Sequence, residues 1–441
     1  MMQQVGIRRE DMYAWERRTP LIPSDARRLV DRQGLDILVQ TSSKRAFREV
    51  EYEEVGIGTA DTLASCPIIV GIKEVPVPVL EPKKVYVFFS HTIKGQPYNM
   101  PMLQRLLDLG CTLIDYEKVT DESGRRLIYF GNYAGLAGMI ETLWAFGQRL
   151  AHEGIVNPFA GLERPLDYPD LETAKAALAE VGARIAETGI PSEVSPLIVG
   201  LAGYGNVSQG AQEILDLLPV RELAPDDVPG FVHREDASLP VIHKVVFKEE
   251  HLVEPVDPAR TFELQDYYDH PERYRGVFER YLPHLGILVN CLYWTPAYPR
   301  LLTKGQARNL YGGDQPRLRV IGDISCDVEG AIECTVKATE PGNPVYVYDS
   351  VSDRATDGVA GAGPVIMAVE ILPTELPREA SAFFSGILKT YLPQIAAADY
   401  DGDFTACDLP PELKRAVIAY RGVLTSDYRY MARFVSENAG I

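Results

Sequence analysis

The stretch VGLAGYGNVSQGAQEILDLL (residues 199–218) joins an apolar run to a helical pattern through the turn Gly203-x-Gly205. In a dinucleotide-binding turn, the first glycine permits the tight bend and the second lets a pyrophosphate approach the backbone. The phosphates then lie at the helix N-terminus, where free N–H groups and the dipole favour an anion. Ser208 stands in place of the third glycine, with Gly210 two residues later. The stretch therefore predicts a nucleotide site, although a glycine turn without a nucleotide is the structural alternative.

The residues after this helix leave the choice between NAD and NADP open. The discriminating side chain is expected about 20 positions past the turn, at the end of the second strand. In PVRELAPDD (219–227), Glu222 would hold a ribose 2′-hydroxyl, whereas Arg221 would bind a 2′-phosphate. A shift of the strand register by one residue would exchange which of the two side chains points inward, toward the nucleotide.

Elsewhere, short apolar runs alternate with helical patterns. We expect strands at 36–40, 67–73, 84–90, 111–117, 195–205, 241–252, 284–294 and 317–325. We expect helices at 24–34 (N-cap Ser24, terminal Gly34), 99–110, 132–154 and 170–189, and a mostly helical tail at 376–441. Strand–helix alternation implies βαβ units, so the fold class is α/β with parallel sheets. Ligands of such sheets bind outside the carboxyl ends of the strands.

Two proton-carrying side chains stand at this position of successive strands, namely Lys73 in IIVGIKEVP and His91 in FFSHTIKGQ. Taken singly, Lys73 also fits a snorkelling surface lysine and His91 a backbone-bonded histidine. Together they suit general acid–base chemistry in a cofactor enzyme. Glu74 and Glu117 lie at the same rim, and a neighbouring carboxylate would raise the pKa of either base. The pairs Arg17–Arg18 and Arg125–Arg126 supply guanidinium groups suited to an anionic substrate.

Composition excludes several classes of protein. The formal net charge of the 441 residues is −18, which argues against nucleic acid as a partner because a basic patch supplies most of that affinity. The N-terminus is charged where a signal peptide is apolar, and no stretch reaches the roughly 20 apolar residues of a membrane span. The six scattered cysteines form no C-x-x-C, which favours reduced thiols over a zinc site. We therefore expect a cytoplasmic protein without a metal or membrane partner.

Several of these motifs resemble a known family when they are taken in order. They include ERRTPLIP (16–23), GIKEVP (71–76), FFSHTIKGQ (88–96), LIDYEKVTDESGRRLIYFGNYAG (113–135), GDISCDVEGAIE (322–333) and ILPTELPREAS (371–381). The chain resembles lysine–2-oxoglutarate reductase, or saccharopine dehydrogenase (L-lysine-forming), and in particular the reductase half of bifunctional aminoadipic semialdehyde synthase. The resemblance covers nearly the whole chain and extends to the alanine dehydrogenase/transhydrogenase superfamily.

The resemblance implies two Rossmann-like domains with an active-site cleft between them. Residues 1–145 with 376–441 would form the substrate and catalytic domain, and 146–375 the dinucleotide-binding domain. The implied reaction joins the ε-amine of L-lysine to the keto group of 2-oxoglutarate and reduces the imine to saccharopine. The implied cofactor is NADP or NAD, with a slight preference for NADP by likeness to the bifunctional type.

The same resemblance assigns roles to individual residues. Lys73 and His91 would be the catalytic acid–base groups, and Arg18 would bind the keto-acid carboxylate. The other residues expected to bind substrate are Glu74, Glu117, Arg126 and Tyr133. The residues expected to bind cofactor are Gly203, Gly205, Asn206, Val207, Ser208 and Glu222, with Asp323 and Gly363 (turn AGAGP, 360–364) near the nicotinamide.

Three alternatives stay open at this point. The first is an alanine-dehydrogenase-like enzyme that uses ammonia, which would not need Glu74 and Glu117 for a second ammonium. The second is an opine synthase that uses another amine, such as ornithine or a polyamine. The third is a nucleotide-binding module without catalysis, in which Lys73 and His91 would be dispensable. Both a monomer and a homo-oligomer are compatible with the sequence.

Overall fold

The computed structural model describes residues 4–232, 234, 240–313 and 316–438. The chain divides into two compact units, Met1–Phe130 with Pro377–Ile441, and Gly131–Leu376. The sequence predicts the first boundary at residue 145, which would cut a helix. In the structure α4 (Gly131–His152) belongs wholly to the second unit, because it packs on α6 (Asn206–Leu215), β13 (Val320–Asp323) and β16 (Val365–Met367) of that unit. Residues 1–3 and 439–441 of the expected first domain lie outside the described residues.

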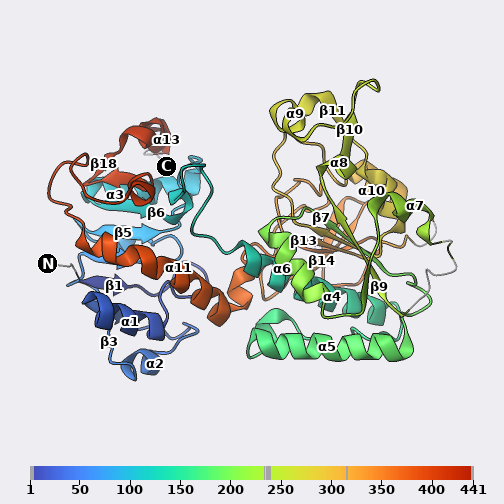
Figure 1. Cartoon of the computed structure of the whole chain (residues 1–441), viewed down its shortest axis with the longest axis horizontal. Coiled ribbons are helices and arrows are strands. Elements are labelled where there is room, and N and C mark those ends of the chain that lie inside the picture. The colour runs from blue at the N-terminus through green and yellow to red at the C-terminus, as the bar shows by residue number, and fades with distance from the viewer. Residues whose placement is uncertain (1–3, 233, 235–239, 314–315, 439–441) are drawn as a thin grey trace. The chain divides into compact units, whose positions relative to one another are not determined.

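The first unit is built on one sheet with the strand order β18-β17-β6-β5-β4-β1-β2-β3. The six strands from the N-terminal segment are parallel, and the two from the C-terminal segment add an antiparallel edge. Their bounds are β1 (Val5–Ile7), β2 (Ile37–Gln40), β3 (Gly58–Ala60), β4 (Ile68–Val70), β5 (Val85–Phe88), β6 (Thr112–Asp115), β17 (Val417–Tyr420) and β18 (Val423–Leu424). In Figure 1 the red C-terminal elements accordingly lie among the blue and cyan ones.

Helices cover this sheet and bury the apolar side chains of both segments in one core. They are α1 (Pro23–Gln33), α2 (Glu49–Glu53), α3 (Met100–Asp108), α11 (Pro377–Ala397), α12 (Pro411–Lys414) and α13 (Ala432–Asn438). The first helix ends at Gly34 with φ +68°, as the sequence predicts. Ser24 is not its N-cap, because the helix already begins at Pro23. The N-cap residue is Ile22, whose side chain makes no capping hydrogen bond. The tail is mostly helical as predicted, but it also contains β17 and β18, which complete the sheet.

The second unit has a mostly parallel sheet with the strand order β15-β14-β16-β13-β12-β7-β9-β8. The bounds are β7 (Ile198–Ala202), β8 (Val220–Glu222), β9 (Ile242–Phe247), β12 (Ile287–Asn290), β13 (Val320–Asp323), β14 (Val345–Asp349), β15 (Arg354–Asp357) and β16 (Val365–Met367). The strands β14 and β15 are antiparallel to their neighbours. A separate ribbon pairs β10 (Val253–Pro255) with β11 (Tyr274–Gly276). The predicted α/β class with parallel sheets is confirmed.

Helices enclose two apolar cores, one on each side of this sheet. Besides α4 they are α5 (Leu171–Thr188), α6 (Asn206–Leu215), α7 (Val228–Phe231), α8 (Glu249–Leu252), α9 (Leu264–Asp269) and α10 (Lys304–Tyr311). The helices α4 and α6 cross in very close contact at two glycines. A Cβ atom on Gly135 would lie 1.9 Å from the Val207 carbonyl oxygen, and one on Gly210 would lie 2.2 Å from the Asn132 carbonyl oxygen. Only glycine lets the backbones approach this closely.

Short 3₁₀ turns complete both units. They are η1 (Val77–Val79), η2 (Pro97–Asn99), η3 (Tyr116–Lys118), η4 (Pro165–Asp167), η5 (Pro225–Asp227), η6 (Pro271–Arg273), η7 (Phe278–Arg280), η8 (Leu282–His284), η9 (Leu372–Glu375) and η10 (Ser426–Met431).

Candidate functional site

The carboxyl edge of the first sheet is the side at which β1, β2, β4, β5 and β6 end. Lys73 follows β4 and His91 follows β5, and these strands are direct neighbours in the sheet. Glu10 follows β1 on the other side of β4. The predicted acid–base residues therefore lie at one sheet edge, where parallel sheets bind ligands.

His91 is held in place by a buried carboxylate. Its Nδ1 atom lies 2.5 Å from Oε1 of Glu74, whose side chain is 2% exposed, whereas the histidine itself is 32% exposed. The ring stacks on Phe89, and the backbone at His91 has φ +48°. Burial would raise the pKa of Glu74, but the hydrogen bond and charge of His91 outweigh it and lower that pKa. The bond leaves Nε2 of His91 as the ring nitrogen that faces away from Glu74.

Lys73 is half-buried between aromatic and acidic groups. Its Nζ atom lies 5.6 Å from the centre of the Tyr13 ring. Its backbone N–H donates to Oε2 of Glu10 at 3.0 Å, while the N–H of Ile72 donates to Oε1 at 2.7 Å. Burial raises the pKa of Glu10. The charge of Lys73 lowers the pKa of both Glu16 and Glu74, so its ammonium group lies near two carboxylates.

Arg18 already has a carboxylate partner within the chain. Glu16 accepts from its Nε at 2.8 Å and from its Nη2 at 2.6 Å, and both side chains are buried. The guanidinium also lies 4.2 Å from the centre of the Phe130 ring. Burial would raise the pKa of Glu16, but the charge and hydrogen bonds of Arg18 outweigh it and hold that pKa below its usual range.

Glu117 and Arg126, predicted separately, form an ion pair with each other. Glu117 follows β6 and is positioned by Asp115, whose Oδ1 accepts the Glu117 N–H at 2.8 Å. Asp115 is fully buried and also accepts from Ser90, and burial raises its pKa to about 6. Tyr133 belongs to the second unit, near the start of α4.

Sequence reasoning did not identify Glu10, Glu16 or Asp115. A signal existed for Asp115, a carboxylate inside the predicted strand 111–117 that is the last residue of β6. Glu10 could not be placed because the three-residue strand β1 was not predicted.

In the second unit, the glycine turn has the predicted local structure. Gly203 follows β7 with φ +99°, and its N–H donates to the Phe247 carbonyl of β9 at 2.9 Å. Gly205 is the N-cap residue of α6, and a Cβ atom there would meet nothing within 4 Å. This open space above a helix N-terminus fits a diphosphate. Asn206 and Val207 form the first turn of α6, and Ser208 is buried and accepts from Gln212 at 3.0 Å.

Glu222 ends the second strand of this unit along the chain, as predicted, but this strand is not the neighbour of β7. It ends β8, which is the edge strand, and the neighbour of β7 is β9 instead. Its side chain is 83% exposed and lies 3.5 Å from Lys244. The residues that follow β9 are Lys248 and Glu249, and these lie beside the glycine turn. Nζ of Lys248 is 6.0 Å from the centre of the Tyr204 ring, and Glu249 accepts from the Tyr268 hydroxyl at 2.8 Å.

Asp323 ends β13 at the same carboxyl edge as the glycine turn. Asn290 donates to its Oδ1 at 2.8 Å, and the Thr335 hydroxyl donates to its Oδ2. Burial raises the pKa of Asp323 to about 6.

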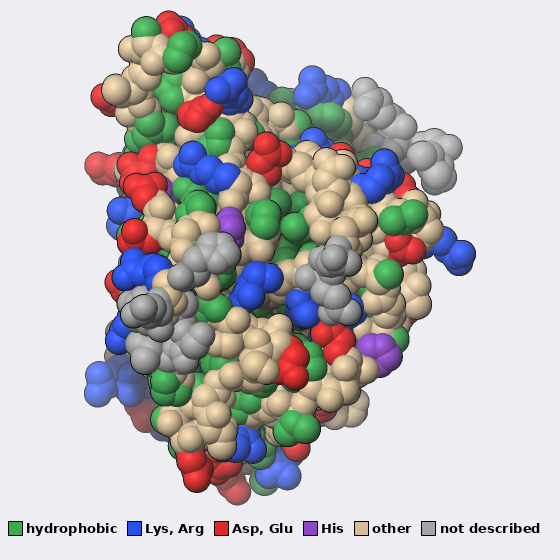
Figure 2. All heavy atoms as spheres, turned by 90° about the vertical axis from the view of Figure 1, so that its right-hand side faces the viewer, with side chains coloured by type: hydrophobic (Ala, Val, Ile, Leu, Met, Phe, Trp, Pro, Cys, Tyr) green, Lys and Arg blue, Asp and Glu red, His purple; other side chains and the backbone are tan. Residues whose placement is uncertain are grey.

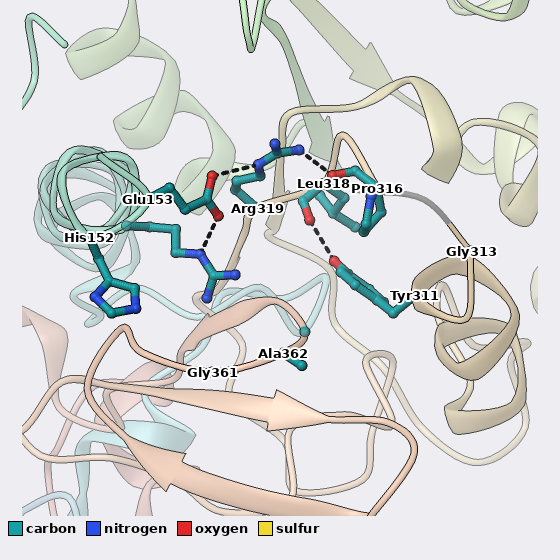
Figure 3. A pocket seen from close by; sticks show the side chains of 11 residues that line it. His152, Glu153, Tyr311, Gly313, Pro316, Leu318, Arg319, Gly361 and Ala362 are labelled. Atoms are coloured by element: carbon teal, nitrogen blue, oxygen red, sulfur yellow. Dashed lines mark hydrogen bonds and ion pairs between the residues drawn. The ribbon is translucent and has the colours of Figure 1, made fainter. Parts of the chain in front are cut away.

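Gly363 lies at the opposite, amino-terminal edge of this sheet, so its assignment near the nicotinamide is wrong. It precedes β16, which is parallel to β13. A Cβ atom on Gly363 would lie 2.0 Å from the Tyr348 carbonyl oxygen, so this glycine is needed for close packing on β14. The loop lines a cavity of about 370 Å³, where Arg149 and Arg319 both pair with Glu153 (Figure 3).

On the face drawn in Figure 2, acidic and basic side chains are interspersed. Within the described ranges, no helix is long and apolar enough to cross a bilayer. The same part of the chain contains no cluster of three or more His, Cys, Asp or Glu placed to hold a metal ion.

Comparisons with known proteins support the fold. Residues 6–137 match the family described as alanine dehydrogenase/PNT, N-terminal domain. The chain resembles L-alanine dehydrogenase in structure, with a TM-score of 0.62 over 99% of this chain and 100% of that one at 16% identity. A transhydrogenase from Sinorhizobium meliloti has a TM-score of 0.58 over 96% of this chain and 100% of that one at 14% identity. These two structures support the fold.

Curated relatives cover nearly the whole chain. An Arabidopsis thaliana alpha-aminoadipic semialdehyde synthase is 39% identical over 98% of this chain and 42% of that protein. The mitochondrial Bos taurus protein of that name is 33% identical over 97% of this chain and 47% of that protein. The chain thus spans less than half the length of these relatives. A Neurospora crassa saccharopine dehydrogenase [NAD(+), L-lysine-forming] is 27% identical over 84% of this chain and 85% of that protein. Over nearly its whole length, the chain is therefore similar to the aminoadipic semialdehyde synthases and, at lower identity, to an L-lysine-forming saccharopine dehydrogenase.

Proposed function

We propose that this protein condenses L-lysine with 2-oxoglutarate and reduces the product to saccharopine. The observation that carries the proposal is the pairing of His91 with the buried Glu74 carboxylate, beside Lys73 at one sheet edge, in a chain similar to these enzymes. Condensation needs a group that removes protons from the attacking ammonium and one that protonates the departing hydroxyl. Two proton carriers backed by a fixed carboxylate supply both functions.

In this proposal Lys73 and His91 divide the proton transfers of imine formation. The lysine ε-amine adds to the keto carbon to give a carbinolamine, and loss of water then leaves the imine. Glu74 fixes the ring of His91 so that Nε2 faces the reacting atoms, and it stabilises the imidazolium when a proton is held there. A bound nicotinamide cofactor would supply the hydride that reduces the imine carbon.

The binding residues are assigned as follows. Arg18 would bind the keto-acid carboxylate. Glu16 accepts from Nε and Nη2 of Arg18 and so fixes the plane of the guanidinium, while the remaining N–H groups of Arg18 stay available to the substrate. The Glu117–Arg126 pair would open to receive substrate charges, and Tyr133 is proposed as a further substrate-binding residue. Each of these roles depends on the proposed reaction.

The cofactor is proposed to bind at the glycine turn of the second unit. Gly203, Gly205, Asn206, Val207 and Ser208 would surround the diphosphate, since the space above Gly205 is open. Asp323 would lie toward the nicotinamide because it shares the carboxyl edge with the turn. Because β9 is the neighbour of β7, the residue that contacts the ribose is expected after β9, and Lys248 there favours the 2′-phosphate of NADP.

Nicotinamide absorbance tests the reaction directly. Purified protein is mixed with L-lysine and 2-oxoglutarate, in parallel with NADPH and NADH, and with ornithine, ammonia or no amine as comparisons. Oxidation that requires both lysine and 2-oxoglutarate is the expected result. Turnover with ammonia alone would establish an alanine-dehydrogenase-like reaction instead, and turnover with ornithine alone would establish another opine synthase.

The predicted cytoplasmic location is also part of the proposal. Because the bovine relative is named as mitochondrial, fractionation of the source cells is the direct test.

A further inference from the structure

A second cavity lies at the carboxyl ends of β1 and β2 in the first unit. Its volume is about 610 Å³, and none of the substrate or catalytic residues assigned above lines it. The residues that line it and carry the argument are Arg9, Glu10, Asp11, Ser42, Lys44 and Glu49.

The lining carries charges of both signs. Arg9 and Lys44 are cations, and Glu10, Asp11 and Glu49 are carboxyl groups, among which Glu10 has a pKa raised by burial. Asp11 and Glu49 are each about one-third exposed, with side-chain values of 29% and 30%. Asp11 pairs with Arg8 at 2.5 Å and with Arg9 at 3.8 Å, and Glu49 pairs with Arg45 at 3.7 Å, so a ligand would exchange its charges for these pairs. Hydroxyl groups lie between the charges, at Thr41, Ser42 and Ser43. A cavity of this kind is complementary to a zwitterion, which offers one ammonium and one carboxylate.

Two residues connect the cavity to Lys73. Glu10 lines the cavity and accepts the backbone N–H of Lys73 at 3.0 Å. Lys44 lines the cavity and donates from Nζ to the carbonyl oxygen of Tyr13, whose ring lies 5.6 Å from Nζ of Lys73. The cavity is therefore adjacent to the proposed acid–base group along the same sheet edge.

We infer that this cavity binds the α-ammonium and α-carboxylate of the amino acid whose terminal amine reacts. The inference rests on the proposed function. In L-lysine four methylenes separate the ε-nitrogen from the α-carbon by about 6 Å. The head group therefore needs its own site, near the reacting centre but separated from it by the length of the side chain. Lys44 is assigned to the carboxylate and Asp11 to the ammonium. A fixed separation also explains how the site would reject ornithine, whose shorter chain cannot reach both ends at once.

Three amines separate the two assignments. L-lysine has both head-group charges, pentane-1,5-diamine lacks the carboxylate and 6-aminohexanoate lacks the α-ammonium. Lys44→Met should raise the KM for lysine and 6-aminohexanoate by about tenfold or more, as expected for a lost charged hydrogen bond, and leave pentane-1,5-diamine unchanged. Asp11→Asn should weaken lysine and pentane-1,5-diamine and leave 6-aminohexanoate unchanged. The KM for 2-oxoglutarate should stay constant in both variants.

Lys83→Met is the matched control, since Lys83 is an exposed cation that precedes β5 at the opposite edge of the same sheet. Calorimetric titration with L-lysine gives a second readout that does not need turnover. Suppose that the wild-type protein binds lysine without reductase activity and that Lys44→Met weakens this binding. That result would overturn the proposed reaction and support the role of the cavity. Normal turnover with an unchanged KM for lysine in both variants would overturn the cavity and leave the reaction in place. A wild-type protein that neither binds nor converts lysine would overturn both.

Discussion

Replacing Gly135 by alanine should destabilise the second unit through the crossing of α4 and α6. The new Cβ atom would lie 1.9 Å from the Val207 carbonyl oxygen, 2.8 Å from the Ala211 nitrogen and 2.9 Å from the Val207 carbonyl carbon. All three are backbone atoms, so no side chain can rotate away and the helices must move apart. Overpacking of this kind typically costs about 1–3 kcal/mol. Because the clash is with backbone, we expect the upper end of that range.

Alanine has the better helix propensity by about 1 kcal/mol, which offsets only part of this cost. A net loss of about 2 kcal/mol should lower the melting temperature by roughly 4–8 °C for a unit of this size. The displacement should also weaken nucleotide binding, because α6 carries the glycine turn at its N-terminus.

Differential scanning calorimetry with and without NADPH measures both effects. Gly386→Ala is the matched control, since that glycine lies in α11 and a Cβ atom there meets nothing within 4 Å. The control should melt at or slightly above the wild-type temperature. An unchanged melting temperature in Gly135→Ala would refute the close backbone contact between α4 and α6.

Three further predictions concern the proposed chemistry and its pH dependence. Lys73→Met should lower kcat by about 10²-fold or more, the usual scale for a lost acid–base group, while fluorescence titration shows unchanged nucleotide affinity; normal turnover would remove Lys73 from the mechanism. Lys248→Ala should raise the KM for NADPH by about tenfold and the KM for NADH much less, as for a lost charged contact. Arg221→Ala on the edge strand should change neither KM. Equal effects of Lys248→Ala on both cofactors would argue against 2′-phosphate recognition. The pKa of the Asp323 carboxyl is raised to about 6 by burial, so its ionisation costs stability as pH rises from about 4 to 6. Asp323→Asn keeps the Asn290 hydrogen bond and should reduce this pH-dependent loss of stability by at most about 3 kcal/mol. Urea unfolding at several pH values measures the free energy of unfolding, and an unaltered pH profile would mean that Asp323 ionises freely.

Local patterns predicted the elements that are long or strongly apolar. The runs ending in Lys73 and Ser90 became β4 and β5 at the expected places, and the glycine turn became the β7–α6 junction. The strand β1 spans only Val5–Ile7 and has no periodicity to detect, so Glu10 at its end was missed. Short strands of this kind are specified by the neighbours that pair with them.

The errors at the candidate cofactor site arose from tertiary pairing. The chain passes from α6 to β8, yet β9 is the strand that pairs with β7. Counting along the sequence therefore selected Glu222 on the edge strand instead of a residue after β9. The turn that contains Gly363 has the composition of a ligand loop, but its glycine is required by the Tyr348 carbonyl. Strand order and strand direction decide such assignments, and neither is local.

The return of residues 377–441 to the first sheet has a consequence for synthesis on the ribosome. The strand β6 is covered on one side by β17, and α1 by α11, so the first unit cannot close until the last of these segments has left the ribosome. The second unit is continuous and can fold before that point. Although domains usually fold from the N-terminus onward during synthesis, here the later-made unit is complete first. In the meantime the nascent β6 edge and the apolar face of α1 stay uncovered, which makes this interval the one in which a chaperone would be needed most.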